Sequence, residues 1–125
     1  MSTSPAVLRM VEVSGAEARL VYTQRELTVV RPGRHAWEFG RLVVRTPAPA
    51  AAVPATVTYH VDEVRAATGT GWSVTVAGPA EVITDPDEAA HYRRTLTGWT
   101  HGPHDTLLHI HPKTLTGYRL ARAEA

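Results

Sequence analysis

Most of the chain places apolar and polar residues alternately in short runs, which is the pattern of half-buried β-strands. Turn residues such as Pro32, Gly33 and Gly40 separate these runs, and β-branched residues are frequent within them. In the first half of the chain the runs cover residues 19–23, 27–31, 35–39, 42–46 and 55–61. Short strands at this spacing predict an antiparallel meander.

The second half continues the same pattern around a central strand at residues 72–77. Gly78 and Pro79 interrupt this strand, and residues 81–84 are predicted to continue it past a bend. Residues 62–71 are polar and end in Thr-Gly-Thr-Gly, so we expect a loop there. Two final strands are predicted at residues 106–111 and 114–120, joined by a turn at 112–113.

One helix start is well marked in the sequence. Asp85 is suited to the N-cap, Pro86 to the first helical position, and two acidic residues follow in the first turn. We expect this helix to run to about Leu96 and to stop near Gly98. Residues 6–13 fit either a short helix or a strand, residues 47–54 fit one helical turn or an extended crossover, and residues 99–104 are expected to form a loop.

Length and pattern together predict a single domain over residues 1–125, with a loose start at 1–5 and a tail at 120–125. About seven strands with one helix indicate a small β-barrel or sandwich covered by that helix.

The chain has 13 Lys and Arg against 12 Asp and Glu, which argues against nucleic acid or an anionic membrane as a partner. It has no cysteine, no membrane-length apolar run and no signal-peptide pattern, so we expect a cytoplasmic protein.

Several short pieces stand in an order that carries a family resemblance. A strand ends in Arg45-Thr46, an acidic pair follows at 62–63, and Gly-Trp-Ser-Val stands at 71–74. The helix start at 85–88 and the closing pieces at 110–112 and 116–119 complete the order. Over roughly residues 15–120 this order resembles the FMN-binding split barrel of the pyridoxamine 5'-phosphate oxidase-like family.

The resemblance implies a single antiparallel split β-barrel of six to seven strands with one short helix, assembled as a homodimer. It also implies an oxidoreductase whose FMN lies at the dimer interface, in a cleft that takes a small-molecule substrate. Arg45 and Thr46 would contact the flavin phosphate, and Arg31, Trp72 and Ser73 would contact the ring. These residue types suit the task, because a phosphate dianion needs guanidinium groups, hydroxyls or amides.

The chain departs from the family in the segment that follows the Arg-Thr strand. Where the family has Gly-Ser-Lys, this sequence has Pro49-Ala50-Ala51, which lacks the lysine, the hydroxyl and one backbone N–H. Pro79 likewise stands where the family commonly has a basic residue. The resemblance therefore implies weaker FMN binding than the family norm, with Arg31 or Arg34 as substitutes for the lost phosphate contacts.

A second function class remains open. A split barrel without flavin could use the same interface cleft as a cyclase, an isomerase or a small-molecule binding protein in a specialised metabolic pathway. Its chemistry would come from cleft shape and a few polar groups, drawn from the set Tyr59, His60, Trp72, Arg45 and His35. Arg45 also has a purely structural interpretation, as a strand-end arginine that extends to solvent.

Four histidines lie close together near the end of the chain, namely His101, His104, His109 and His111. Residues two apart share one strand face, so the last two could bind one metal ion together with a loop histidine or Asp105. The simpler explanation is that they are half-exposed polar residues on the outer face of a barrel strand. We expect no metal at this cluster, and the sequence assigns it no role.

Overall fold

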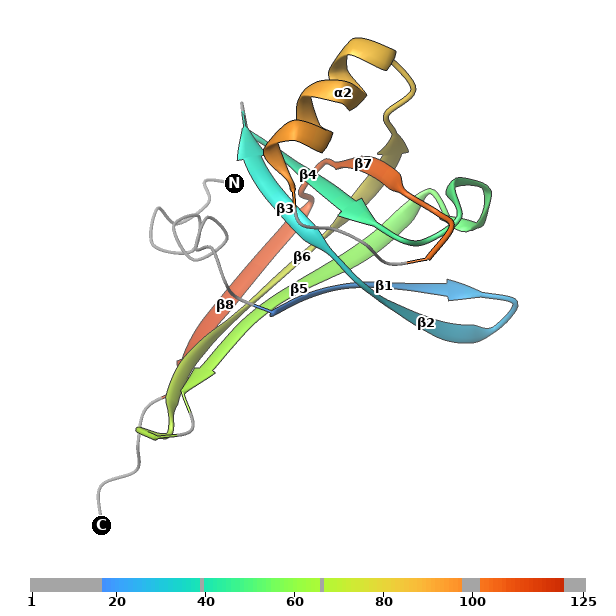
Figure 1. The fold of residues 1–125 in the computed structure, drawn as a ribbon. Coiled ribbons are helices and arrows are strands. Elements are labelled where there is room, and N and C mark those ends of the chain that lie inside the picture. The colour runs from blue at the N-terminus through green and yellow to red at the C-terminus, as the bar shows by residue number, and fades with distance from the viewer. Residues whose placement is uncertain (1–16, 39, 66, 98–101, 121–125) are drawn as a thin grey trace.

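The computed structural model describes residues 17–38, 40–65, 67–97 and 102–120 (Figure 1). This part of the chain contains eight strands, one α-helix and one turn of 3₁₀-helix. The strands are β1 (Glu17–Gln24), β2 (Leu27–Pro32), β3 (Arg34–Glu38), β4 (Arg41–Thr46), β5 (Thr56–Arg65), β6 (Thr70–Val82), β7 (Thr106–Ile110) and β8 (Thr114–Leu120). The helix is α2 (Pro86–Thr95) and the 3₁₀ turn is η1 (Ala50–Ala52).

The strands form one strongly bent antiparallel sheet in the order β2-β1-β5-β6-β7-β4-β3, with β8 beside β6. We call β2, β1, β5, β8 and the first part of β6 the main sheet. The helix-side sheet consists of β3, β4, β7 and the end of β6, and α2 lies over it (Figure 1). This arrangement confirms the predicted split-barrel class. The strand number is eight rather than six to seven, and each of the eight strands overlaps one of the alternating runs of the sequence.

Strand β6 joins the two sheets because it is long and changes its neighbour. Its first part pairs with β8, from Gly71 opposite Leu120 to Ala77 opposite Thr114. Its last three residues pair with β7, while β5 pairs with β6 from Thr70 to Pro79. The predicted continuation of the central strand past Gly78 and Pro79 is therefore confirmed.

Two apolar clusters stabilise the fold. The larger one lies inside the bent sheet, and its largest fully buried side chains include Tyr59, Leu20 and Leu42. The smaller one lies between α2 and the helix-side sheet, where Tyr92 and Leu96 pack on Val43 and Leu107. Adjacent residues of β4 therefore face different clusters, since strand side chains alternate between faces.

The sequence-based expectation of a loop at residues 62–71 is wrong. Strand β5 continues to Arg65 and β6 begins at Thr70, so the connection is short. The polar side chains fit the strands because they bond across them: Ser73 donates to Asp62 at 2.8 Å. For residues 47–54 the sequence allowed one helical turn or an extended crossover. The structure has the helical turn, which is η1.

Helix α2 follows its sequence signals. Asp85 is the N-cap, and its side chain accepts a hydrogen bond from the backbone N–H of Glu88 at 2.9 Å. The helix ends at Thr95 with Leu96 as C-cap.

Within the described residues, no helix has the length and apolar character needed to cross a membrane. The expectations for residues 6–13 and for the helix stop at Gly98 lie outside the described residues.

Candidate functional site

The two residues predicted to contact phosphate project to opposite faces of β4. Thr46 is fully buried, and its hydroxyl donates to the backbone carbonyl of Pro32 at 3.0 Å. Arg45 faces α2 instead, and its side chain is only 12% exposed. Because neighbouring strand residues alternate in direction, these two side chains do not converge on one ligand atom.

The guanidinium group of Arg45 is occupied by contacts within the protein. Its Nε and Nη2 donate to the two carboxylate oxygens of Asp105 at 2.8 and 2.9 Å. Its Nη1 donates to the carbonyls of Leu96 and Arg93, at 2.5 and 3.4 Å, where α2 ends. The hydrogen bond from Arg45 is the largest cause that holds the pKa of Asp105 below its ordinary value, and a hydrogen bond from Arg93 acts in the same direction.

Arg31 and Arg34 are placed differently from Arg45. Arg31 lies near the end of β2, Arg34 begins β3, and both side chains are exposed. Within the described part of the chain neither one forms an ion pair. Gly33 sits at the bend between them, where an added Cβ would lie 2.8 Å from the Tyr59 ring, so the backbone approaches the core closely there.

Trp72 and Ser73, the predicted ring contacts, lie on the arm made by the far ends of β5, β6 and β8 (Figure 1). Trp72 donates its indole N–H to Glu63 at 3.1 Å. Ser73 donates to Asp62, which also accepts from Arg19 at 2.6 Å. On neighbouring strands Trp72 stands opposite Glu63 and Arg119, whereas Arg45 stands opposite Arg34 and Leu107. One chain therefore does not bring Arg45 and Trp72 together.

The altered segment Pro49-Ala50-Ala51 forms the start of η1. Pro49 is its N-cap and makes no side-chain cap bond. The turn is closed by backbone bonds from Ala52 to Pro49 and from Val53 to Ala50. This segment has no side-chain hydrogen-bond donor, because two alanines follow the proline. Arg45, Thr46 and this segment therefore do not form one phosphate-binding site within a single chain.

Of the alternative catalytic residues, the structure brings two together. His35 Nδ1 and the Tyr59 hydroxyl are 2.8 Å apart, and Tyr59 is fully buried in the core. Burial raises the pKa of Tyr59 far above its ordinary value, so the phenol stays protonated. His60 lies apart from this pair, with its Nδ1 2.9 Å from the hydroxyl of Thr75.

The three late histidines that the structure describes do not share one partner. His109 is 7% exposed and its Nε2 makes a short contact with the Glu88 carboxylate, while its Nδ1 has no partner in the described residues. His111 Nε2 lies 3.6 Å from Glu81, and His104 is exposed. No three described His, Cys, Asp or Glu residues are grouped to hold a metal ion. His101 lies outside the described residues.

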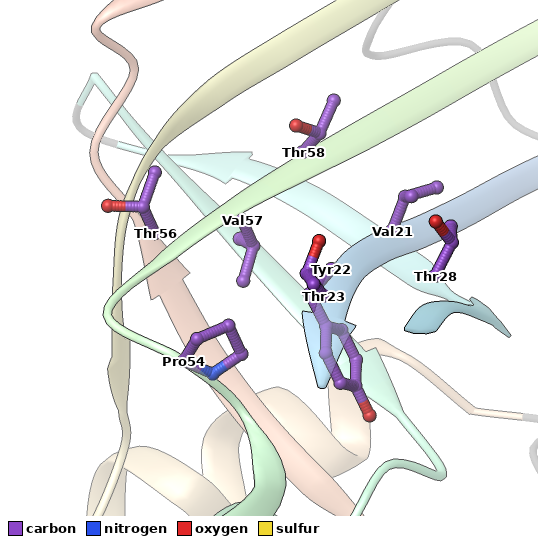
Figure 2. Close-up of a pocket in the computed structure, with 8 residues that line it drawn as sticks. All are labelled: Val21, Tyr22, Thr23, Thr28, Pro54, Thr56, Val57 and Thr58. Atoms are coloured by element: carbon purple, nitrogen blue, oxygen red, sulfur yellow. The ribbon is translucent and has the colours of Figure 1, made fainter. Parts of the chain in front are cut away.

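A hollow of about 290 Å³ lies where β1 and β5 separate, and no signal in the sequence indicated it. The last pair between these strands is Val21 opposite Thr58, after which β1 follows β2 alone. Figure 2 shows the hollow, which has hydroxyl and apolar groups but no charged side chain in its wall. Its lining residues are Val21, Tyr22, Thr23, Thr28, Pro54, Thr56, Val57 and Thr58.

Comparison with known proteins agrees with the architecture. The family model described as pyridoxamine 5'-phosphate oxidase matches residues 4–124. The chain therefore belongs to the pyridoxamine 5'-phosphate oxidase family. It is 34% identical over 111 residues to Rv0080, an uncharacterized protein of Mycobacterium tuberculosis, and the match covers 82% of this chain and 73% of that protein.

Two solved structures share the fold. The FAD binding protein from Mycobacterium smegmatis superposes with a TM-score of 0.73 at 23% identity, covering 98% of both chains. A FAD-binding protein of Mesorhizobium loti superposes with a TM-score of 0.71 at 17% identity, covering 97% of this chain and 96% of that one.

Proposed function

We propose that this protein binds a flavin nucleotide in a cleft shared by two copies of the chain and acts as an oxidoreductase. The observation that carries the proposal is the family match over residues 4–124, together with structural relatives that are named as FAD-binding proteins. FMN is the flavin that the sequence resemblance implies, and FAD is the flavin for which these relatives are named. A bound flavin would supply the redox chemistry, and the protein would orient it and tune its electronics.

The positions of the predicted residues favour a site built from two chains. Arg31 lies at the β2–β3 bend, whereas Trp72 and Ser73 lie on the arm of β5, β6 and β8 (Figure 1). A two-fold dimer would let the arm of one copy reach the bend of the other. In this arrangement Trp72 offers an indole face to the ring and Ser73 offers a hydroxyl, while Arg31 offers a cation.

A second candidate function is a flavin-free binding protein or non-redox enzyme in the same cleft. The specific observation in its favour is that Arg45 and Thr46 both donate their hydrogen bonds to groups within the protein. The segment at Pro49-Ala50-Ala51 adds no side-chain donor. Such a protein could also take an uncharged ligand in the hollow between β1 and β5, whose lining has no charged side chain.

The content of the purified protein distinguishes the two functions. Protein purified without added cofactor is denatured, and the released small molecules are identified by absorbance and mass. Release of FMN or FAD in near-stoichiometric amount supports the proposal. A protein that releases no flavin, and that takes up none from 100 µM FMN or FAD (about 100 times a typical micromolar Kd), favours the flavin-free alternative.

A further inference from the structure

We propose that Arg45 fastens the end of helix α2 to the sheet, and that Arg31 and Arg34 hold the phosphate of the flavin in its place. The assignment of phosphate to Arg31 and Arg34 rests on the proposed flavin function, whereas the role of Arg45 does not. The family resemblance gives the phosphate to Arg45 and Thr46, with Arg31 or Arg34 only as substitutes for lost contacts, whereas here Arg45 takes no part in phosphate binding.

The contacts of Arg45 have the form of a helix clamp. The last carbonyls of a helix have no partner within it, and a cation placed there is favoured by the helix dipole. Arg45 donates to two of these carbonyls, at Arg93 and Leu96, and forms a two-point bond with Asp105. Asp105 also accepts from Arg93 at 3.0 Å, which ties the helix to the segment before β7. A phosphate could reach Arg45 only by breaking this set.

Arg34 adds a further positive charge beside this clamp. It stands directly opposite Arg45 on β3, which is an edge strand, so the two side chains share a face. Like charges in such positions repel each other. The Asp105 carboxylate is shared by Arg45 and Arg93, and no carboxylate of the described residues pairs with Arg34.

Arg31 lies three residues before Arg34, on the other side of the Pro32–Gly33 bend. Both guanidinium groups are exposed, so they can reorient toward an anion without losing an ion pair within the described residues. Planar guanidinium groups bind phosphate oxygens through paired N–H donors. The β2–β3 bend therefore has the chemistry of a phosphate site that the η1 segment lacks.

The role of Arg45 is tested by a double-mutant cycle on thermal unfolding of the protein without added flavin. Arg45→Met and Asp105→Asn should each lower Tm by about 5–10 °C, because each removes charge-assisted hydrogen bonds at the end of α2. The double variant should lie within about 3 °C of Arg45→Met, because both changes break one shared contact. Losses that simply add, or an unchanged Tm, would contradict the clamp.

The phosphate assignment is tested by comparing FMN with riboflavin, which lacks the phosphate. We expect the wild type to bind FMN at least about tenfold more tightly than riboflavin. Arg31→Gln/Arg34→Gln should bring this ratio close to one. Arg45→Met should keep the ratio, and so should the control Arg41→Gln, which removes an exposed arginine at the other end of the β3–β4 pair.

Two outcomes would overturn the assignment in different ways. If Arg45→Met loses the preference for FMN and Arg31→Gln/Arg34→Gln keeps it, the phosphate belongs to Arg45 and the inference is wrong. If the wild type binds neither FMN nor riboflavin, the proposed function fails and the assignment to Arg31 and Arg34 fails with it. The double-mutant cycle on Tm would still decide the role of Arg45 by itself.

Discussion

At the scale of single residues, Gly78 shows how closely the backbone is packed where the two sheets meet. A Cβ at this position would lie 1.9 Å from the carbonyl oxygen of His111. The turn between β7 and β8 crosses β6 there, and it is held by backbone bonds from His111 to Pro79 and from Lys113 to Ala77, both at 2.9 Å. Only a residue without a side chain allows this crossing.

We predict that Gly78→Ala destabilises the protein by about 2–3 kcal/mol, because the turn must move and its two backbone bonds weaken. Gly40→Ala is a suitable control: no atom would lie within 4 Å of its Cβ, and its cost of about 1 kcal/mol comes only from its positive φ of 72°. Urea unfolding measures both changes. Equal losses in the two variants would mean that the crossing tolerates a methyl group.

At the scale of elements, helix α2 is fastened mainly by polar contacts. It buries only Ala89 and Tyr92 within its own length. Its first turn is capped by Asp85 and its Glu88 contacts His109, while Arg45 holds its end. A helix with so little apolar contact depends on these caps, because short helices are marginal in water.

We predict that Asp85→Ala lowers stability by about 1 kcal/mol, because the backbone N–H of Glu88 loses its acceptor. Asp85→Asn keeps a side-chain oxygen at the cap and should cost much less. Chemical denaturation of the three proteins gives the comparison. A loss in Asp85→Asn as large as in Asp85→Ala would show that the charge, and not the cap bond, stabilises the helix.

The contact between Asp105 and Arg45 also predicts an acid dependence. The pKa of Asp105 is lowered in the folded protein, so this contact stabilises the fold above the ordinary aspartate pKa of 3.8. That stabilisation is lost as the pH falls below about 4 and through the lowered folded value. We therefore expect the Tm of Asp105→Asn to fall less steeply than that of the wild type between about pH 5 and pH 3. Parallel pH profiles would contradict the lowered pKa.

The sequence predicted most of these elements because their signals are local. The cap at Asp85, the alternation in β4 and the bend at Gly78 each depend on a few neighbouring residues. The end of β5 and the first residues of β6 were missed because a polar residue such as Asp62 finds its hydrogen-bond partner only across the strand pair. The contact of Arg45 with Asp105 could not be predicted, because 60 positions separate the two residues and the pairing of β4 with β7 brings them together.

At the scale of the whole molecule, the residues predicted for the flavin lie in two separate places. The strand end at Arg45 and the bend at Arg31 belong to one region, and the arm with Trp72 and Ser73 belongs to another (Figure 1). The sequence identified candidate residues by type and order, but it could not show that Arg45 is engaged internally. The hollow between β1 and β5 was missed, since it arises from the point at which two strands separate.

We predict that the protein is a homodimer at micromolar concentration. Leu27, Val30, Val64 and Tyr118 are between 51% and 70% exposed in the single chain, and the shared cleft requires a second copy. Light scattering coupled to size exclusion measures the mass in solution. A monomer of 13.6 kDa at every concentration tested would contradict both the dimer and the shared cleft.

Titration of the flavin-free protein with FMN tests the central claim most directly. Flavin fluorescence is followed as protein is added, with FAD titrated in parallel. We predict saturable quenching with one flavin per chain and a dissociation constant in the micromolar range, about −8 kcal/mol. Fluorescence that does not change for either flavin up to 100 µM protein would contradict flavin binding and leave the flavin-free function as the better account.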